Sequence, residues 1–219
     1  MQLNTVIFDM DGLLIDSEPC WQEAGMETLG QFNAALSPDQ YHFTTGLRTK
    51  EWIDYWFGHF SVDKTLAPAA ISALHENVIG KIKSKAPAMA GIEPIFSFFK
   101  AKGFRIGLAT SSPLSLVDVV VEKLGIGSFL DATSSAEDLP FGKPHPQVYM
   151  DCAALLGVNP LQCICFEDSF NGLIAAKAAR MKCVVIPTPD QYGLAKWGAA
   201  DLKLPSLLAF GDAQLEELA

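Results

Sequence analysis

The chain has 219 residues, of which 49% are hydrophobic and 19% charged, a composition typical of an ordered globular protein that excludes a disordered one. Its net charge of −9 argues against a nucleic-acid or anionic-membrane surface, since phosphate contacts need clustered Lys and Arg. No apolar run approaches the ~20 residues of a membrane helix, and we expect neither a membrane span nor a signal peptide.

An apolar segment at residues 6–8 runs directly into Asp9, Asp11 and Gly12. Such a short run, bounded by a turn, predicts a buried strand of a parallel sheet. Ligands of open α/β sheets bind beyond the carboxyl ends of these strands. Two carboxylates there repel each other unless a cation or a shared proton intervenes, so the segment indicates Mg²⁺ and a phosphorylated ligand. An ordinary polar turn after a strand is the alternative, and this motif alone leaves both open.

Residues 17–85 show apolar positions at helical spacing, with breaks at Pro and Gly, and predict a block of helices. From residue 91 onward helices and strands alternate, which predicts a doubly wound, Rossmann-like parallel sheet. Loops of βα units usually have about 2–6 residues, far fewer than the helical block that separates the first strand from the rest of the sheet. We therefore expect an α/β core, residues 1–16 and 86–219, with an inserted all-helical cap domain, residues 17–85.

Hydroxyl side chains follow the strand predicted at residues 104–109. Thr110, Ser111 and Ser112 precede Pro113, which suits the first position of a helix with Ser112 as its N-cap. A helix N-terminus at a strand end is a ready anion site. Plain capping explains Ser112 equally well but leaves Thr110 and Ser111 unexplained.

Lys143 and a second acidic pair complete the series. Lys143 stands just before a helix predicted to start near Pro146, where a cation would neutralise a phosphoryl group, although a solvated loop Lys is the simpler reading. Glu167 and Asp168 end the apolar strand 163–166, and Mg²⁺ prefers such oxygen ligands. Each motif alone has an ordinary explanation. Together, each at the end of a strand, they predict a phosphoryl-transfer site.

This order of motifs resembles the haloacid dehalogenase-like hydrolase superfamily over essentially the whole chain. The helical block resembles the mobile cap of its β-phosphoglucomutase-like branch. Within that branch, residues 8–19, 143–149 and 167–172 are similar to phosphatases of 2-deoxyglucose 6-phosphate and hexitol phosphates. The resemblance implies a hydrolase of a small phosphomonoester, a sugar or sugar-alcohol phosphate.

The same resemblance implies the roles of the site residues. Asp9 would be the nucleophile and Asp11 the general acid and base. Thr110, the Ser111 amide and Lys143 would bind the transferring phosphoryl group.

A Mg²⁺ cofactor is also implied by the resemblance. Its ligands would be the carboxylates of Asp9 and Asp168 and the main-chain carbonyl of Asp11. Glu167 would bind the ion directly or through water.

Substrate contacts are sought in the helical block and beside the second motif. Trp21, Arg48 and Ser112 are the candidates for substrate contact.

A phosphosugar mutase of the same branch binds a second phosphate with Lys-Asn after the second motif and with a cap Arg. Here those two positions carry Pro113 and Leu114, and Arg48 is offset by one residue from the mutase arginine. Hydrolysis is therefore preferred over the mutase reaction.

A different class of function, a phospho-receiver or ligand-sensing module without turnover, also combines acids, a hydroxyl and a Lys at strand ends. Asp11 disfavours it, because an acid there would hydrolyse the acyl-phosphate.

Five cysteines without the spacing of a disulfide framework predict reduced thiols and a cytoplasmic protein. We expect a monomer or weak dimer whose partner is a small phosphomonoester.

Overall fold

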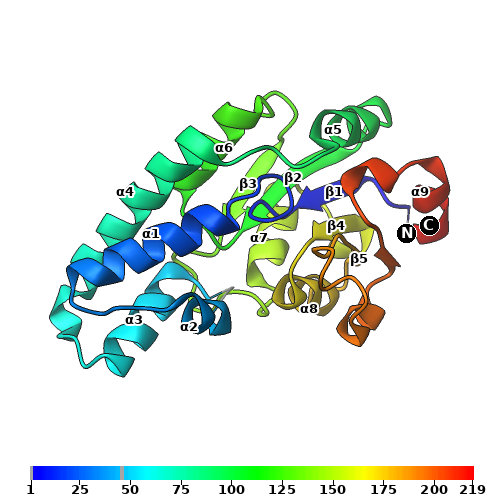
Figure 1. Cartoon of the computed structure of the whole chain (residues 1–219). Helices are drawn as coiled ribbons and strands as arrows, with labels where there is room; N and C mark the ends of the chain where they lie inside the picture. The colour runs from blue at the N-terminus through cyan, green and yellow to red at the C-terminus, as the bar shows by residue number, and fades with distance from the viewer. Residues whose placement is uncertain (1, 45–46) are drawn as a thin grey trace.

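The computed structural model describes residues 2–44 and 47–219. Helices α1–α4 lie together on one side of the molecule, away from the sheet (Figure 1). The helices and strands, in chain order, are β1 (Thr5–Phe8), α1 (Glu18–Gln31), α2 (Pro38–Phe43), α3 (Thr49–His59), α4 (Ala67–Lys85), α5 (Ile92–Ala101), β2 (Arg105–Thr110), α6 (Leu114–Leu124), β3 (Ala132–Ser135), α7 (Gln147–Leu155), β4 (Cys163–Glu167), α8 (Phe170–Ala178), β5 (Lys182–Val185), β6 (Leu202–Lys203) and α9 (Asp212–Leu218).

Within the described residues the strands form one six-stranded sheet in the order β3-β2-β1-β4-β5-β6, with every pair parallel. This order confirms the doubly wound, Rossmann-like fold, whose ligand crevice lies where the strand order reverses, beside β1. Phe8 is in register with Leu108 of β2 and Phe166 of β4. The residues that follow these three positions therefore meet at one edge of the sheet.

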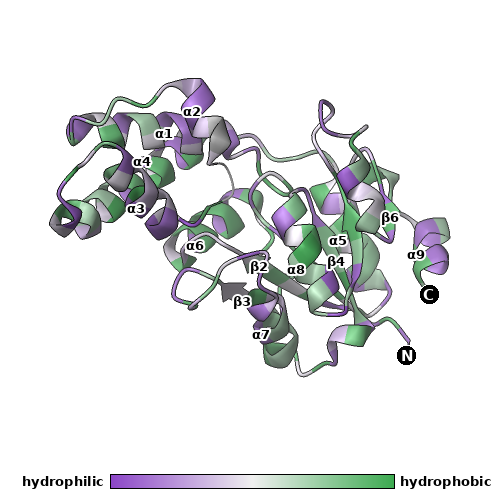
Figure 2. Cartoon of the chain, turned by 90° about the horizontal axis from the view of Figure 1, so that it is seen from below, coloured by the Kyte–Doolittle hydropathy of each residue, from purple (hydrophilic) through white to green (hydrophobic). Residues whose placement is uncertain are grey.

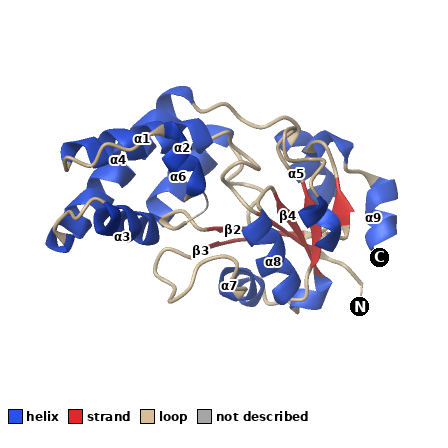
Figure 3. Ribbon diagram, turned by 60° about the horizontal axis from the view of Figure 1, so that its bottom comes forward, coloured by secondary structure: helices blue, strands red, loops and turns tan. Residues whose placement is uncertain are grey.

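Both faces of the sheet are buried at its centre, which is why the central strands β1 and β4 are largely apolar along their length and not alternating. In β4, Ile164 and Phe166 face one layer, and Cys163 and Cys165 face the other. Helices α5 and α6 cover the first face, while α7 and α8 cover the second (Figure 3). All five cysteines are free and buried.

The helical block shares its core with the first face of the sheet. Its helices mix hydrophilic and hydrophobic residues along each ribbon, as amphipathic helices do (Figure 2). Their buried side chains, such as Trp56, Phe57 and Val78, belong to the same continuous apolar cluster as Phe8 and Phe96. This packing joins the block to the sheet, and its division into a separate cap domain stays a prediction.

Two strands lack a sequence signal, and one local expectation differs from the structure. The edge strands β3 and β6 are not evident in the sequence, because β3 is polar and β6 has two residues. Pro113 is the N-cap of α6 and not its first helical residue, so the expectation of Ser112 as N-cap is wrong by one position. The backbone of Pro113 is extended, with φ −65° and ψ 150°, so the helix begins only at Leu114, and the Ser112 hydroxyl donates to Asp11. Among the described residues no helix combines the length and the apolarity needed to cross a membrane.

Candidate active site

Asp9 begins the site, directly after β1. Its main-chain N–H donates to the carbonyl of Phe166 at 3.0 Å, which continues the pairing of β1 with β4 by one residue. The Lys143 Nζ lies 2.5 Å from Asp9 Oδ1 and also donates to the carbonyl of Ala109 at 3.2 Å. The side chains of Lys143 and Asp9 are 6% and 9% exposed, so this ion pair is largely withdrawn from water.

The charges of this pair depend on each other. Burial raises the pKa of Asp9 to about 7; the Lys143 ammonium lowers it, and the carboxylates of Glu167 and Asp11 raise it. Burial disfavours the Lys143 ammonium, but the Asp9 and Glu167 carboxylates outweigh this and raise the pKa of Lys143. Lys143 is therefore a permanent cation, whereas the ionised form of Asp9 needs positive charge beside it.

Glu167 holds the lysine from the other side. Its Oε1 accepts from Lys143 Nζ at 2.7 Å and from the Tyr149 hydroxyl at 2.5 Å. Its Oε2 accepts from the main-chain N–H and the hydroxyl of Ser169, at 3.1 and 2.9 Å. A Cβ at Gly172 would lie 1.8 Å from Oε1, so only glycine lets the start of α8 approach this carboxylate. Four donors thus fix Glu167, whose side chain is fully buried.

Tyr149 is a residue of this cluster that the sequence reasoning missed. It lies in the first turn of α7, six residues after Lys143 in the chain, with its ring 4.8 Å from the Lys143 Nζ. It falls within the segment 143–149, on which the family resemblance partly rests. That position and the hydroxyl group are the sequence features that could have indicated its role in the site. A buried Tyr usually needs a hydrogen-bond partner, and here that partner is Glu167.

Asp168 supplies a carboxylate of which one oxygen is buried and unpaired among the described residues. Its Oδ1 is buried and makes no hydrogen bond within the part of the chain that the structure describes. Burial, with Asp9 and Glu167 nearby, raises the pKa of Asp168 well above its usual range. Gly12 has φ +79°, and a Cβ there would lie 2.1 Å from Asp168 Oδ2. The turn after β1 therefore requires glycine to leave room for this carboxylate.

These acids fit a divalent cation. Asp9, Glu167 and Asp168 each offer an oxygen, and these atoms lie within 4.8 Å of one another. Grouped carboxylates with one buried orphan oxygen match the oxygen-ligand preference of Mg²⁺. A cation there would also offset the repulsion that raises the pKa of Asp9 and Asp168.

Asp11 lies in a different set of contacts from the other acids. Its Oδ1 accepts from the Ser17 hydroxyl at 2.6 Å and the Trp21 indole N–H at 3.1 Å. Its Oδ2 accepts from the hydroxyls of Ser112 at 2.7 Å and Thr110 at 3.4 Å. The carboxylate thus links the start of the helical block to the end of β2. Two candidate substrate contacts, Trp21 and Ser112, touch this acid directly.

The second motif forms a tight turn between β2 and α6. Thr110 Oγ1 accepts from the main-chain N–H of Ser112 at 3.0 Å, and the Ser135 hydroxyl donates to the carbonyl of Ser112 at 2.7 Å. Ser111, between them, is partly exposed. Its expected contact to a phosphoryl group stays a prediction, as does that of Thr110.

Arg48 does not join this cluster. Within the described residues its guanidinium donates to main-chain carbonyls of the loop after β3 and to Glu51, and to no acid of the strand ends. Its expected role as a substrate contact stays a prediction. In the structure the side chain binds the loop after β3.

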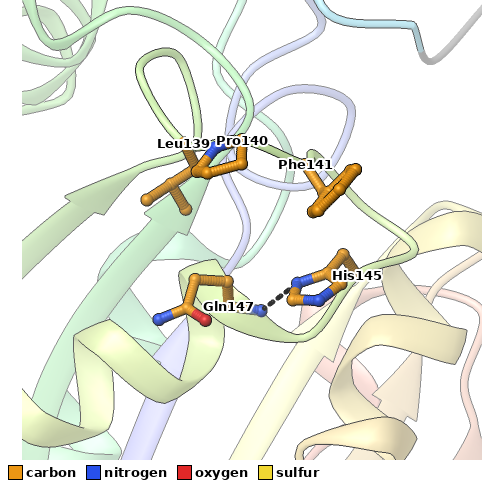
Figure 4. Close-up of a pocket in the computed structure, with 5 residues that line it drawn as sticks. All are labelled: Leu139, Pro140, Phe141, His145 and Gln147. Atoms are coloured by element: carbon orange, nitrogen blue, oxygen red, sulfur yellow. Dashed lines mark hydrogen bonds between the residues drawn. The ribbon is translucent and has the colours of Figure 1, made fainter.

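An apolar pocket is lined by residues on both sides of Lys143 in the chain, namely Leu139, Pro140, Phe141, His145 and Gln147 (Figure 4). The main-chain N–H of Gln147 donates to His145 Nδ1 at 3.3 Å, and the Phe141 ring, 64% exposed, lies 5.4 Å from the His145 ring. None of the acids of the cluster is among these lining residues.

Comparisons with known proteins identify the family of the chain. A family model described as haloacid dehalogenase-like hydrolase matches residues 3–180. Hexitol phosphatase B of Escherichia coli (strain K12) is 39% identical over 207 residues, covering 94% of this chain and 93% of the relative. The phosphorylated carbohydrates phosphatase of Thermotoga maritima is 28% identical, covering 93% of this chain and 95% of its own.

Solved structures show the same fold. The crystal structure of CbbY from Rhodobacter sphaeroides in complex with phosphate has a TM-score of 0.87 and 25% identity, with 99% of each chain covered. The β-phosphoglucomutase of Clostridium difficile has a TM-score of 0.85 and 21% identity, covering 99% of this chain and 96% of its own, and this likeness concerns the fold alone.

Proposed function

The chain belongs to the haloacid dehalogenase-like hydrolase family, and on that premise we propose that it is a Mg²⁺-dependent phosphatase of a sugar or sugar-alcohol phosphate that acts through an aspartyl-phosphate on Asp9. One observation carries the proposal: the Lys143 ammonium lies 2.5 Å from the Asp9 carboxylate inside a buried cluster of acids. The substrate class is supported by the hexitol and phosphorylated-carbohydrate phosphatases among the relatives.

Asp9 is the nucleophile of the first step. One of its carboxylate oxygens attacks phosphorus, the bond between phosphorus and the substrate oxygen breaks, and the phosphoryl group stays on Asp9. Water then attacks the same phosphorus, which releases inorganic phosphate and restores the carboxylate. Lys143 neutralises charge on the transferred group in both steps, and Glu167 holds the ammonium in place.

Asp11 moves the proton. The Trp21 indole N–H is a donor only, so it keeps Asp11 Oδ1 an acceptor. Oδ2 faces the hydroxyls of Ser112 and Thr110, which can either donate or accept. We therefore assign the proton to Oδ2, from which it passes to the leaving oxygen of the substrate. The same atom then takes a proton from the attacking water.

Asp9 and Asp168, with the main-chain carbonyl of Asp11, would hold the cation. The buried orphan Oδ1 of Asp168 supports this assignment. When bound, Mg²⁺ supplies positive charge that offsets the charge of the carboxylates and the phosphate oxygens. Both oxygens of Glu167 already accept from donors of this chain, so we assign Glu167 to orienting Lys143 and not to direct ligation.

Hydrolysis is favoured over a mutase reaction because a grip on a second phosphate is missing among the expected residues. Pro113 and Leu114 carry no side-chain donor, and the donors of Arg48 Nη1 and Nη2 are engaged by Glu51 and by main-chain carbonyls. A non-turnover receiver is disfavoured by Asp11, which lies at the same strand ends with a proton-accepting oxygen toward Ser112.

The test is phosphate release from a panel of hexitol and hexose phosphates, with and without Mg²⁺. We expect release that requires Mg²⁺ and disappears in Asp9→Asn, while the matched control Asp54→Asn, at an exposed position of α3, retains it. Activity of Asp9→Asn near that of the wild type would refute the nucleophile. Conversion of a hexose 1-phosphate to its isomer with a catalytic bisphosphate would favour the mutase, and a long-lived phospho-adduct without turnover the receiver.

A further inference from the structure

Arg48 lies just before α3 in the helical block, yet its side chain reaches the loop after β3. Nη1 donates to the carbonyls of Ala136 at 3.0 Å and Leu139 at 2.5 Å, and Nη2 donates to that of Pro140 at 3.3 Å. Nη2 also pairs with Glu51 Oε1 at 2.6 Å, and Glu51 Oε2 accepts from the Arg48 main-chain N–H at 3.2 Å. Glu51 thereby fixes the guanidinium in the direction of the loop.

The stem of Arg48 packs against Gly142. A Cβ at Gly142 would lie 2.6 Å from Arg48 Cδ and 2.8 Å from Nε, so this approach depends on glycine. The Arg48 side chain is only 11% exposed, and its Nε is buried without a partner among residues 2–44 and 47–219. Arginine side chains are almost never this buried unless they are paired. The contact is therefore a specific, hydrogen-bonded part of the packing and not a chance surface contact.

The loop that Arg48 holds leads into the active site. It begins where the Ala136 N–H donates to the carbonyl of Thr110 at 2.8 Å, at the end of β2. It ends at Gly142, whose next residue is Lys143. The carbonyls that bind Arg48 thus lie between two residues of the site. A shift of this loop would move the Lys143 ammonium away from Asp9.

A second contact joins the same two parts of the chain. His75 on α4 has its Nδ1 3.7 Å from Glu137 Oε1, in the loop. Its Nε2 lies 3.1 Å from the hydroxyl of Thr49, the residue after Arg48. The helical block therefore approaches the loop at two points, and the hydrogen bonds of Arg48 are the stronger of the two contacts.

We propose that Arg48 is a positioning residue: it clamps the helical block onto residues 136–142 and thereby holds Lys143 against Asp9. The clamp is a property of the folded chain, whereas its effect on turnover rests on the proposed phosphatase function. Packing of the helical block on the loop and positioning of Lys143 beside Asp9 are then coupled, because the same guanidinium makes the contacts on which both depend.

The clamp is tested without any substrate by hydrogen–deuterium exchange of the full chain. In Arg48→Ala the amides of residues 136–142 should exchange about tenfold faster, while those of β4 and α8 keep their wild-type rates. Gly142→Ala should act in the same direction, because its Cβ displaces the arginine stem while every charge remains. Arg48→Lys should restore part of the protection. Lys50→Ala, an equal loss of charge at an exposed position of α3, should change nothing.

Kinetics separate clamping from substrate contact. A displaced lysine weakens the transition state more than the bound substrate, so Arg48→Ala should lower kcat by roughly 100-fold with little change in KM. A guanidinium that contacted substrate instead would, on removal, raise KM and leave kcat largely unchanged.

Two results would overturn the clamp: unchanged exchange of residues 136–142 in Arg48→Ala, or equal acceleration in every peptide, which would indicate general destabilisation. If the exchange changes as expected while the wild type releases no phosphate from any tested ester, the proposed function fails and the clamp stands.

Discussion

Lys143 at the strand ends and Lys85 in the helical block both pair with carboxylates, but in opposite surroundings. Lys143 is 6% exposed and its partner Glu167 is fully buried, whereas Lys85 and its partner Glu23 are 49% and 44% exposed. Burying an ion pair costs desolvation that the attraction scarcely offsets, while an exposed pair contributes about 0–1 kcal/mol. The buried pair is therefore explained by the geometry it holds and the exposed pair by modest support of two packed helices.

Removing Lys143 should show the difference between the buried and the exposed ion pair most strongly. Lys143→Met leaves Asp9 and Glu167 buried without their cation, and we expect a loss of about 3–5 kcal/mol in the free energy of unfolding, together with loss of phosphate release. Urea denaturation measures the first effect. The matched change Lys85→Met should cost less than about 1 kcal/mol. Equal losses in the two variants would contradict the distinction.

Gly172→Ala tests the close approach of α8 to Glu167. The new Cβ would lie 1.8 Å from the carboxylate, so we expect a loss of about 3 kcal/mol or more from overpacking. Gly80→Ala in α4 is the control, because nothing lies within 4 Å of its Cβ position. It should stabilise the helix by about 0.5–1 kcal/mol. Thermal unfolding should shift in opposite directions, and a Gly172→Ala midpoint at or above that of the wild type would argue against the packing.

Tyr149→Phe removes one donor from Glu167 and leaves Lys143. A hydrogen bond to a charged group contributes about 1.5–3 kcal/mol, so we expect a loss in this range in the free energy of unfolding. We also expect kcat to fall, because Glu167 orients Lys143 less firmly. Tyr55→Phe, at an exposed position of α3, should have no effect. A wild-type kcat in Tyr149→Phe would place the hydroxyl outside the support of Lys143.

Glu23→Gln is the smallest and the most pH-dependent change. Hydrogen bonds from Lys85 and Lys81 lower the pKa of Glu23 from 4.5 to about 2. Because the folded pKa lies below the unfolded one, the stabilisation is present above pH 4.5 and is lost as the pH falls toward 2. The wild type should thus exceed Glu23→Gln slightly in stability at pH 6, and the difference should shrink below pH 4.5. A difference that grows on acidification would contradict this sign.

The strand ends are predictable from sequence because topology alone brings them together. Asp9 and Glu167 each end an apolar run, and a parallel sheet aligns such ends whatever the loops do. The edge strand β3 escapes prediction because its residues Ala-Thr-Ser-Ser carry no apolar signal, and its pairing partner decides its structure.

Side chains that act across the fold could not be assigned in the same way. Arg48 and Trp21 are expected substrate contacts, a role that stays a prediction, and the sequence gives no sign of their contacts with main-chain carbonyls and with Asp11. Gly142 and Gly172 matter only because another segment approaches them, which no local pattern records. The distances that decide these roles are between residues far apart in the chain.

The most direct test of the account is acid quenching of the Mg²⁺-loaded enzyme during turnover of a hexitol phosphate, followed by mass spectrometry of its peptides. The account predicts one phosphoryl group on the peptide that contains Asp9, and none in the Asp9→Asn variant. Steady phosphate release with the label on another residue, or with no label trapped at any quench time, would contradict Asp9 as the nucleophile.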